Sequence, residues 1–478
     1  MKYLLSIIFT LTIFGNDKPN IIFIAIDDLR NELACYGVDK IKTPHIDNLA
    51  KHGLIFDNAY CQIAICSPSR TSVLTGLRPQ STKVFDLTTH FRDTVPDVIT
   101  LGQFFKQKGY ITQGFGKIYH NSLDDPRSWS IKHFMSKNSL YQRAENQQLI
   151  KNQVKAAKEK KLKGHEFRFA TMGPAYESAD VPDEAYPDGE NTKLAIKALK
   201  GFVQKKQPFF LALGFSKPHL PFNAPKKYWD LYEEDKLDPP AISHRPLDSH
   251  PRLTLTKSGE VRSYHGVVKE GSLGAEMSSK LKHGYYASVS YIDALIGKFL
   301  QSLKDTGLDK NTIVILWSDH GFKLGEYDSW VKHSNMEIDA RVPLIISSPW
   351  MKVKGVRTNA LVELVDIYPS LVDLSGFTVP TFLEGTSFAP LLKKPNTPWK
   401  KAAFSQYNRG SKIMGYSVRT AYFRYTEWRL VKNNKVIFKE LYDQVNDPLQ
   451  SRNIAKKEEV KIVQAELHEM INQQWGLK

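Results

Sequence analysis

Two short apolar runs interrupt the alternation of hydrophobic and polar positions along the chain. Residues 21–26 (IIFIAI) and 312–317 (TIVILW) have the length and the β-branched side chains of strands buried on both faces. Between them, apolar residues recur at a spacing of four within 285–303, which predicts an amphipathic helix. Strands that alternate with helices predict an α/β core with a largely parallel sheet.

The stretch from about 121 to 190 is polar and only weakly periodic. We expect it to form an insertion or a set of long loops over one end of the sheet. Its lysines are densest between Lys151 and Lys163. They form either a solvated face or a surface that meets an anionic ligand.

The pattern changes beyond Pro390, where a proline-bearing linker follows. Strand-like segments at 416–425 and 428–431 come next, and a last helix is predicted near 460–473. We therefore expect a main catalytic domain over 16–395 and a smaller α+β domain with an antiparallel sheet over 396–478.

The first 15 residues place one lysine ahead of an apolar run that is too short to span a bilayer. Gly15 is a small residue at a plausible cleavage point, so 1–15 resembles a secretory signal, with a buried core strand as the alternative. The expectation is export to the periplasm or the medium. Because no later stretch approaches the apolar length of a membrane span, we expect no stable membrane insertion.

Composition narrows the class of protein further. The chain has 478 residues, with 41% apolar and 24% charged side chains, as in an ordinary folded enzyme. Its net charge of +16 suits acidic partners, and charge alone does not choose among nucleic acid, an anionic membrane and an anionic polymer. Three cysteines cannot form a disulfide framework, and whether Cys35 and Cys61 pair is left open.

Acidic side chains follow both predicted core strands. Asp27 and Asp28 end the first strand, and Asp319 and His320 end the second. Ligands gather beyond the carboxyl ends of strands in such sheets, so the two groups are expected to meet. Hard carboxylate oxygens favour Ca²⁺ or Mg²⁺, with Ca²⁺ as our choice, whereas an isolated Asp-Asp pair would be a helix cap or a solvated turn.

The sharpest local signal lies at Cys66, in the string CSPSRTSVLTG. Ser67 is a good N-cap and Pro68 suits the first helical position, which would place Cys66 just ahead of an electropositive helix N-terminus. Arg70 would lie one turn along and favour an anionic group there. The alternative is a buried structural cysteine beside a capped helix.

That string resembles the signature of type I sulfatases, in which the cysteine is oxidised to Cα-formylglycine (3-oxoalanine). The similarity continues along the chain in strings such as GKIYH, SKPHLPF and SDHGF, most closely as in iduronate-2-sulfatase-like members and bacterial polysaccharide sulfatases. The resemblance implies an alkaline-phosphatase-like sandwich with a large mixed, mostly parallel central sheet and a smaller C-terminal α+β domain. It also implies a formylglycine-generating or anaerobic maturase as a partner that modifies Cys66.

The resemblance assigns roles to individual residues. One Ca²⁺ would be held by a set that includes a histidine where many sulfatases have Asn: Asp27, Asp28, Cys66, Asp319 and His320. The catalytic residues would be Cys66, Arg70, Lys117, His120, His219 and Lys332.

In this scheme the formylglycine hydrate supplies an oxyanion nucleophile that attacks sulfur. Arg70, Lys117 and Lys332 would stabilise the sulfate oxygens. His219 would protonate the leaving sugar oxygen, and His120 would take the proton that lets the aldehyde re-form. Without the resemblance, His120 would be read as a structural histidine.

The expected substrate is a sulfated polysaccharide or its oligosaccharides, with algal ulvan first, and no nucleic acid. Four residues border the sugar pocket in similar enzymes or lie beside its sulfate-binding lysine, and each has a structural alternative: Asp86, His90, Arg92 and His333. Two rivals remain, a phosphatase or phosphonate monoester hydrolase of the same fold and an inactive secreted protein that binds anionic glycans.

Overall fold

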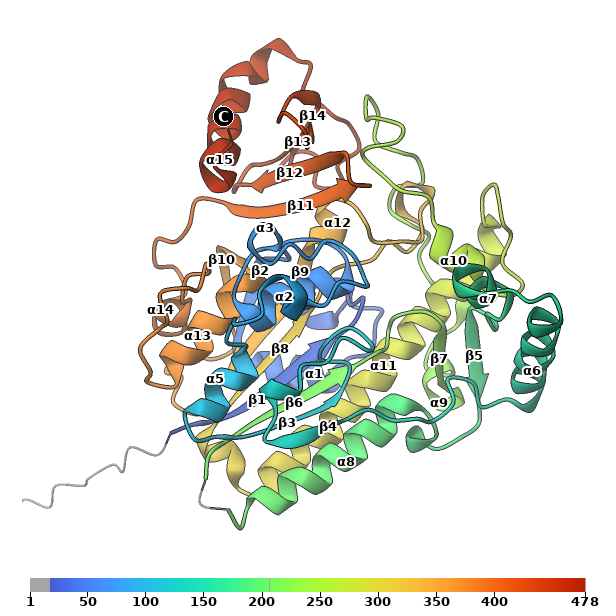
Figure 1. The fold of residues 1–478 in the computed structure, drawn as a ribbon, viewed down its shortest axis with the longest axis vertical. Coiled ribbons are helices and arrows are strands. Elements are labelled where there is room, and N and C mark those ends of the chain that lie inside the picture. Colours follow the sequence, from blue (N-terminus) through green and yellow to red (C-terminus); the bar gives the residue numbers. More distant parts are fainter. Residues whose placement is uncertain (1–17, 206, 478) are drawn as a thin grey trace, which may run out of the picture.

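The first apolar run forms β1 (Asn20–Ile26), which lies inside an eight-stranded sheet of the computed structural model (Figure 1). The structure describes residues 18–205 and 207–477, so the expected signal peptide (1–15) lies outside them. β1 pairs in parallel with β8 (Thr312–Ser318) on one side and with β6 (Phe209–Phe215) on the other. The other strands of this sheet are β2 (Leu54–Tyr60), β3 (Ile111–Gly116), β4 (Ile131–Phe134), β9 (Arg341–Ser347) and β10 (Val356–Glu363).

The strand order is β10-β2-β9-β8-β1-β6-β3-β4. β9 runs antiparallel to both of its neighbours, and the other pairings are parallel. The prediction of a mixed, mostly parallel central sheet is therefore confirmed.

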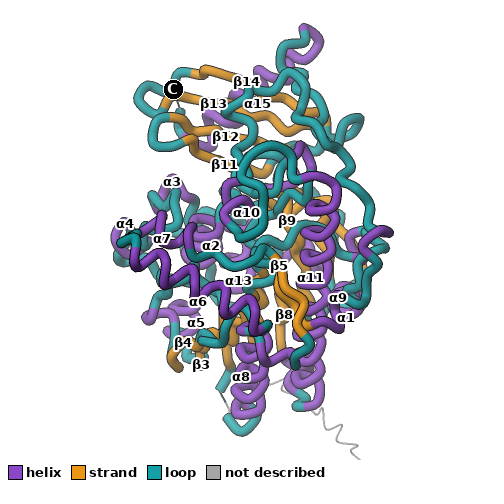
Figure 2. Tube along the Cα trace, turned by 90° about the vertical axis from the view of Figure 1, so that its right-hand side faces the viewer, coloured by secondary structure: helices purple, strands orange, loops and turns teal. Residues whose placement is uncertain are grey.

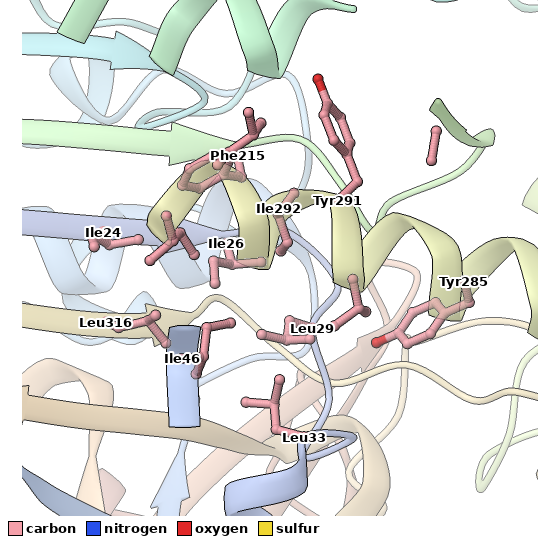
Figure 3. Packing of buried hydrophobic residues seen from close by; sticks show 14 of the residues in the cluster. Ile24, Ile26, Leu29, Leu33, Ile46, Phe215, Tyr285, Tyr291, Ile292 and Leu316 are labelled. Carbon is pink, nitrogen blue, oxygen red and sulfur yellow. The ribbon is translucent and has the colours of Figure 1, made fainter. Parts of the chain in front are cut away.

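Helices cover both faces of this sheet, which is why β1 has no polar face. Ile24 and Ile26 point into one hydrophobic core (Figure 3), and Phe23 belongs to the other. The first core is covered by α1 (Pro44–Lys51), α8 (Pro187–Phe202), α9 (Lys226–Trp229) and α11 (Gly274–Asp305). The second is covered by α2 (Cys66–Thr75), α5 (Leu101–Gln107), α13 (Ile367–Leu374) and α14 (Ala389–Lys393).

The helix expected over 285–303 is the second half of α11, which begins earlier, at Gly274. Its aromatic and aliphatic side chains, among them Tyr285 and Ile292, belong to the same hydrophobic core as Ile24 and Ile26, and Tyr285 lies beyond the end of β1 (Figure 3). The shorter helices are α3 (Pro79–Thr82), α4 (Phe91–Thr94), α10 (Gly259–Ser263) and α12 (Glu337–Ala340).

The stretch 121–190 is more ordered than long loops, so that expectation is corrected. It contains α6 (Ala144–Glu159) and α7 (Gly164–Ala170), and its β5 (Tyr176–Ala179) pairs in parallel with β7 (Phe222–Pro225). α6 buries only Ala157 fully, and a helix with so little apolar surface gives a weak periodic signal. The lysines within 151–163 are exposed, as expected of a solvated face.

The predicted C-terminal antiparallel sheet is confirmed, with one correction. Its strands are β11 (Ala403–Arg409), β12 (Ile413–Arg419), β13 (Phe423–Leu430) and β14 (Val436–Asp443), and α15 (Lys461–Trp475) packs against it. The segment 416–425 is not one strand, because the chain reverses between β12 and β13. Thr420 and Phe423 close that turn by a backbone hydrogen bond of 2.9 Å, without the glycine or proline that marks a turn in sequence.

The structure also bears on the open question of cysteine pairing and on the expectation about membrane insertion. Cys35, Cys61 and Cys66 are all free thiols, so Cys35 and Cys61 do not pair. Among residues 18–205 and 207–477, no helix has the length and apolar content needed to cross a membrane.

Candidate active site

The carboxyl ends of β1 and β8 bring the two acidic groups together, as their places in the sequence predict. The Asp319 N–H donates to the Ile26 carbonyl oxygen (3.2 Å), and the Asp28 N–H donates to Asp319 Oδ1 (3.2 Å). Asp28 has a φ of +59°, a left-handed conformation that Asp tolerates better than most residues. Because of this backbone bend, the carboxylates of the consecutive residues Asp27 and Asp28 both reach the same buried site.

Cys66 reaches the same site from the start of α2. The helix begins at Cys66 itself and not after it, so the placement of Ser67 as the N-cap is corrected. The Ile65 carbonyl oxygen already accepts from the Ser69 N–H (3.1 Å), which closes the first turn earlier than expected. Ser69 Oγ also donates to the Asp319 carbonyl oxygen (2.6 Å) and fastens α2 to the end of β8.

His320 is oriented with its Nε2 toward the cysteine. Its Nδ1 lies 2.9 Å from the Gly321 carbonyl oxygen, which fixes the ring, and Nε2 lies 3.3 Å from Cys66 Sγ. Nε2 is also 3.5 Å from Asp28 Oδ1. A carbonyl partner on one ring nitrogen leaves the other free as a metal ligand.

The donor set fits a divalent cation. Ligand atoms of two overlapping groups lie within 4.8 Å of one another: Asp27, Asp28, Cys66 and His219, and Asp27, Cys66, Asp319 and His320. Within residues 18–205 and 207–477, Asp28 Oδ1 is buried and has no hydrogen-bond partner, a costly state that a bound cation would relieve. Three buried carboxylates favour a hard ion such as Ca²⁺.

Arg70 lies behind these carboxylates. Its guanidinium donates to Asp319 Oδ2 (2.8 Å), to Asp27 Oδ1 (3.3 Å) and to the Lys117 carbonyl oxygen (2.5 Å). The side chain is only 1% exposed. With its donors used in this way, Arg70 orients the carboxylates of the candidate metal site rather than presenting a free cation to a substrate.

Two lysine ammonium groups flank the cysteine and line a shared cavity. Lys117 Nζ pairs with Asp27 Oδ2, and Lys332 Nζ lies 3.0 Å from Asp28 Oδ2. Burial opposes the charged form of Lys332, but Asp28 and other nearby anions raise its pKa well above the usual value. Lys332 therefore stays charged at neutral pH.

Glu260 on α10 joins the site, although no sequence motif marked it. Its carboxylate lies 2.9 Å from Lys332 Nζ and 3.2 Å from His219 Nε2. His219 is further fixed by its Nδ1, 2.7 Å from the Leu220 carbonyl oxygen. Lys217, also unassigned from sequence, donates to the carbonyl oxygens of His219 (2.8 Å) and Pro221 (2.5 Å) and fastens this loop.

His120 and His333 differ in their surroundings. Burial, and then the charge of Lys117, lower the pKa of His120 to about 3, so its ring is neutral at neutral pH. Burial and Lys332 also lower the pKa of His333. The His333 ring lies against Tyr407 (5.9 Å between centroids), and its carbonyl oxygen accepts from Arg409 (3.1 Å), so the C-terminal sheet supports this loop.

These side chains open into one cavity of about 910 Å³. Its polar lining contains most of the expected catalytic residues together with Glu260: Asp27, Cys66, Lys117, His120, His219, Glu260, Lys332 and His333. Ile150, Arg168 and Phe169 of α6 and α7 form another part of its wall. Both helices lie beyond the carboxyl ends of β1 and β6 (Figures 1 and 2).

The structure does not bring Asp86, His90 and Arg92 into this cavity, although the neighbouring Leu87 and Thr88 line it. Asp86 accepts hydrogen bonds from Thr88 and Thr89 in a surface turn. His90 caps α4, and Arg92 pairs with Asp125 (2.8 Å) and with backbone carbonyl oxygens. Their polar atoms stabilise the local backbone, as expected if these three residues have structural roles.

Comparison with known proteins decides the family. Residues 19–377 match the sulfatase family, and residues 325–475 match the C-terminal region of N-sulphoglucosamine sulphohydrolase. The chain belongs to the sulfatase family. This confirms the resemblance on which the interpretation of Cys66 rests, and it makes the protein a sulfuric ester hydrolase.

Relatives match this sulfatase over most of their length. Iduronate 2-sulfatase of Mus musculus is 33% identical over 92% of this chain and 91% of its own. The ulvan-active sulfatase of Formosa agariphila is 29% identical over 95% and 80%.

Solved structures confirm the alkaline-phosphatase-like fold. A protein in complex with its substrate D-glucosamine-2-N,6-O-disulfate matches with a TM-score of 0.72 and 23% identity, over 96% of this chain and 98% of that one. The phosphonate monoester hydrolase of Agrobacterium radiobacter matches with a TM-score of 0.73 and 22% identity, over 96% of both chains.

Proposed function

We propose that this sulfatase removes sulfate from a sulfated polysaccharide or its oligosaccharides, with Ca²⁺ and a formylglycine made from Cys66. The observation that carries the proposal is that Lys117 and Lys332 line one cavity with Cys66, and that a hard-cation donor set lies beside the same cysteine. A sulfate ester needs these parts: a nucleophile, cations for its oxygens and a proton donor for the leaving alcohol.

Asp27, Asp28, Asp319 and His320 would hold the cation beside the residue-66 side chain. When bound, Ca²⁺ supplies positive charge that favours ionisation of a hydroxyl and binding of sulfate oxygens. Formylglycine supplies a geminal diol, which a plain cysteine lacks.

Residues of the chain would then act on the substrate in order. Lys117 and Lys332 bind the sulfate oxygens from two sides of residue 66. His219, whose ring is held by Nδ1 at the Leu220 carbonyl oxygen, donates the proton on its Nε2 to the departing sugar oxygen, and the nearby Glu260 carboxylate favours the protonated ring. His120, neutral at the working pH, takes a proton from the second hydroxyl of residue 66 when sulfate leaves.

A sugar chain is the substrate class that several observations favour. The net charge of +16 attracts a polyanion. The cavity of about 910 Å³ has room for a sugar ring beside the sulfate. The relatives that act on iduronate 2-sulfate and on ulvan point the same way, and ulvan is our first candidate.

The signal predicted at 1–15 supports the proposal that this activity lies outside the cytoplasm, in the periplasm or the medium. A formylglycine-generating or anaerobic maturase would act on Cys66 before the chain folds around it.

The test is sulfate release from defined fragments of ulvan, carrageenan, fucoidan and glycosaminoglycans. Nitrophenyl sulfate and phenylphosphonate monoesters are assayed in parallel, and Cys66→Ala protein serves as the blank. We expect one sulfated glycan to be the best substrate. Faster turnover of the phosphonate ester would support the phosphonate hydrolase, and binding of glycans without turnover by Cys66-converted protein would support the inactive binding protein; either result contradicts the proposal.

A further inference from the structure

A second cavity, of about 1160 Å³, adjoins the catalytic one. Phe169 of α7 and Ser263 of α10 line both cavities. α10 separates them, because its Glu260 faces the catalytic cavity while Gly259 and Arg262 line the second. Figures 1 and 2 show α7 and α10 on the same side of the molecule, beyond the sheet.

Basic side chains dominate the charge of the second cavity. Five cations line it, Arg245, Arg252, Lys257, Arg262 and Lys269, against three anions, Glu166, Glu270 and Asp328. The excess is two positive charges, and none of the residues proposed to act on the sulfate lines this cavity.

Three of these cations, Arg245, Arg262 and Lys269, donate to backbone carbonyl oxygens near the cavity, and the other two are available to a ligand. Arg262 donates to the carbonyl oxygens of Val268 (3.0 Å) and Gly271 (2.5 Å), which holds the loop after α10 in place. The side chains of Arg252 and Lys257 are exposed, and within the described part of the chain they make no hydrogen bond or ion pair.

The boundary between the cavities carries a surface suited to a sugar ring. Phe169 is 39% exposed, although it is a large apolar side chain. An exposed aromatic ring offers a flat apolar face to the C–H groups of a sugar. A chain leaving the catalytic cavity past Phe169 would bring its next anionic groups to Arg252 and Lys257.

We propose that this second cavity binds a sulfate or carboxylate group on a sugar other than the one that loses its sulfate. The inference rests on the proposed function, since it assumes a sugar chain in the catalytic cavity. It makes the enzyme selective for chains of several sugars over a single sulfated sugar. Electrostatic contacts of this exposed kind act mainly by adding affinity for the longer chain.

The test measures binding to Cys66→Ala protein, which needs no turnover. Heparin disaccharide and hexasaccharide are titrated by calorimetry into this protein, and into the same protein carrying Arg252→Ala and Lys257→Ala. The matched control carries Lys432→Ala and Lys435→Ala, which remove two exposed charges from the turn after β13, outside both cavities. A hexasaccharide of galacturonic acid shows whether carboxylates suffice.

We expect the hexasaccharide to bind more tightly than the disaccharide. Arg252→Ala with Lys257→Ala should weaken hexasaccharide binding by about three- to tenfold and leave disaccharide binding unchanged, because exposed charge contacts contribute little each. The control pair should bind both as the parent does. Equal affinity for the two lengths, or an equal loss in the control pair, would overturn the proposal.

The same oligosaccharides separate this inference from the proposed function. If the chain-length effect on binding is present but converted enzyme releases no sulfate from any glycan, the second cavity stands and the catalytic proposal fails. If sulfate is released equally well from short and long chains, and the two bind with equal affinity, the catalytic proposal is supported and the second-cavity proposal fails.

Discussion

Buried charges of opposite sign face each other around Cys66. Asp27 meets Lys117 and Arg70, and Asp28 meets Lys332. Burial opposes ionisation of Asp27, yet Lys117, His219 and Arg70 together hold the pKa of this carboxyl well below its usual range. Removing one member of such a set leaves an uncompensated buried charge, which costs more than the pair contributes.

Asp319 gives the first prediction at the residue scale. Asp319→Ala should lose bound Ca²⁺ and lower sulfate release by more than about a hundredfold, because a carboxylate ligand and the partner of Arg70 disappear together. Elemental analysis and the rate of sulfate release measure the two effects. For wild-type protein, chelation should abolish activity and Ca²⁺ should restore it. Full activity after exhaustive chelation, with no metal detected, would contradict the metal assignment.

The fold brings most of the side chains predicted around Cys66 together, but it does not bring Asp86, His90 and Arg92 into the same cavity. Cys66 and Asp319 lie in contiguous motifs at strand and helix ends, so the local pattern locates them. Glu260 lies on a five-residue helix in a polar segment, and only the tertiary fold brings it to Lys332. Asp86 and Arg92 were expected near the sugar only by resemblance, and the local sequence does not show that Thr88 and Asp125 pair with them.

At the scale of elements, close packing of strand ends positions Lys117. Gly116 has a φ of +68° at the end of β3, and a Cβ there would lie 2.1 Å from the Gly214 carbonyl oxygen of β6. A Cβ on Gly214 would in turn lie 2.2 Å from the Lys117 carbonyl oxygen. The two glycines let β3 and β6 approach where Lys117 leaves the sheet.

We predict that Gly214→Ala destabilises the protein by about 3 kcal/mol and nearly abolishes sulfate release, because the Lys117 backbone must move. Denaturant unfolding and turnover measure the two effects. The matched variant is Gly201→Ala in α8, where a Cβ meets nothing within 4 Å. It should keep full activity and equal or greater stability. Equal effects of the two variants would refute this account of the strand ends.

A second prediction concerns α12, which joins the C-terminal sheet to the main domain. Glu337 lies 2.7 Å from Arg424 and 3.1 Å from Arg419. Burial alone would raise its pKa, but the two arginines lower the pKa of Glu337 to about 2. Because the folded pKa is below the unfolded value of 4.5, this carboxylate stabilises the fold above pH 4.5, and that stability is lost as pH falls toward 2.

Glu337→Gln should therefore lower the free energy of unfolding by about 3 kcal/mol at pH 7, with the difference from wild type shrinking below pH 4.5. Unfolding in urea across this pH range measures it. Glu458→Gln, at an exposed ion pair, should change stability by less than about 0.5 kcal/mol at every pH. A difference for Glu337→Gln that does not depend on pH would contradict the assignment.

The accuracy of the predicted element boundaries depended on how clear the local hydrophobic pattern is. The runs at β1 and β8 were placed to within a residue or so because buried strands have no polar interruptions. The turn between β12 and β13 was missed because Thr420 and Tyr422 carry no turn signature. α6 and α7 were missed because most of their surface faces water or the cavity, which weakens the apolar period.

Across the whole molecule, charge and shape both favour a long anionic substrate. The chain carries 66 basic and 50 acidic residues. Lysine and arginine side chains also line both of the adjoining cavities. Long-range attraction of this kind is screened by salt, since the Debye length falls from about 10 Å at 0.1 M to about 3 Å at 1 M. The salt dependence of turnover is thus a property of the whole surface.

We predict that kcat/KM for a sulfated hexasaccharide falls by about tenfold or more between 0.05 and 0.5 M salt, and for nitrophenyl sulfate by less than about threefold. At low salt the hexasaccharide should be the better substrate. Better turnover of the aryl ester than of every sulfated glycan would contradict the polysaccharide assignment.

The central claim is that a formylglycine at position 66 performs the reaction. The most direct measurement compares preparations made with and without a formylglycine-generating enzyme, reading the converted fraction of Cys66 by mass spectrometry beside the rate of sulfate release. We predict that the rate is proportional to the converted fraction, and that Cys66→Ala is inactive although folded, while Cys35→Ala keeps its activity. Full turnover by protein whose Cys66 is an unmodified thiol, or by Cys66→Ala, would contradict the claim.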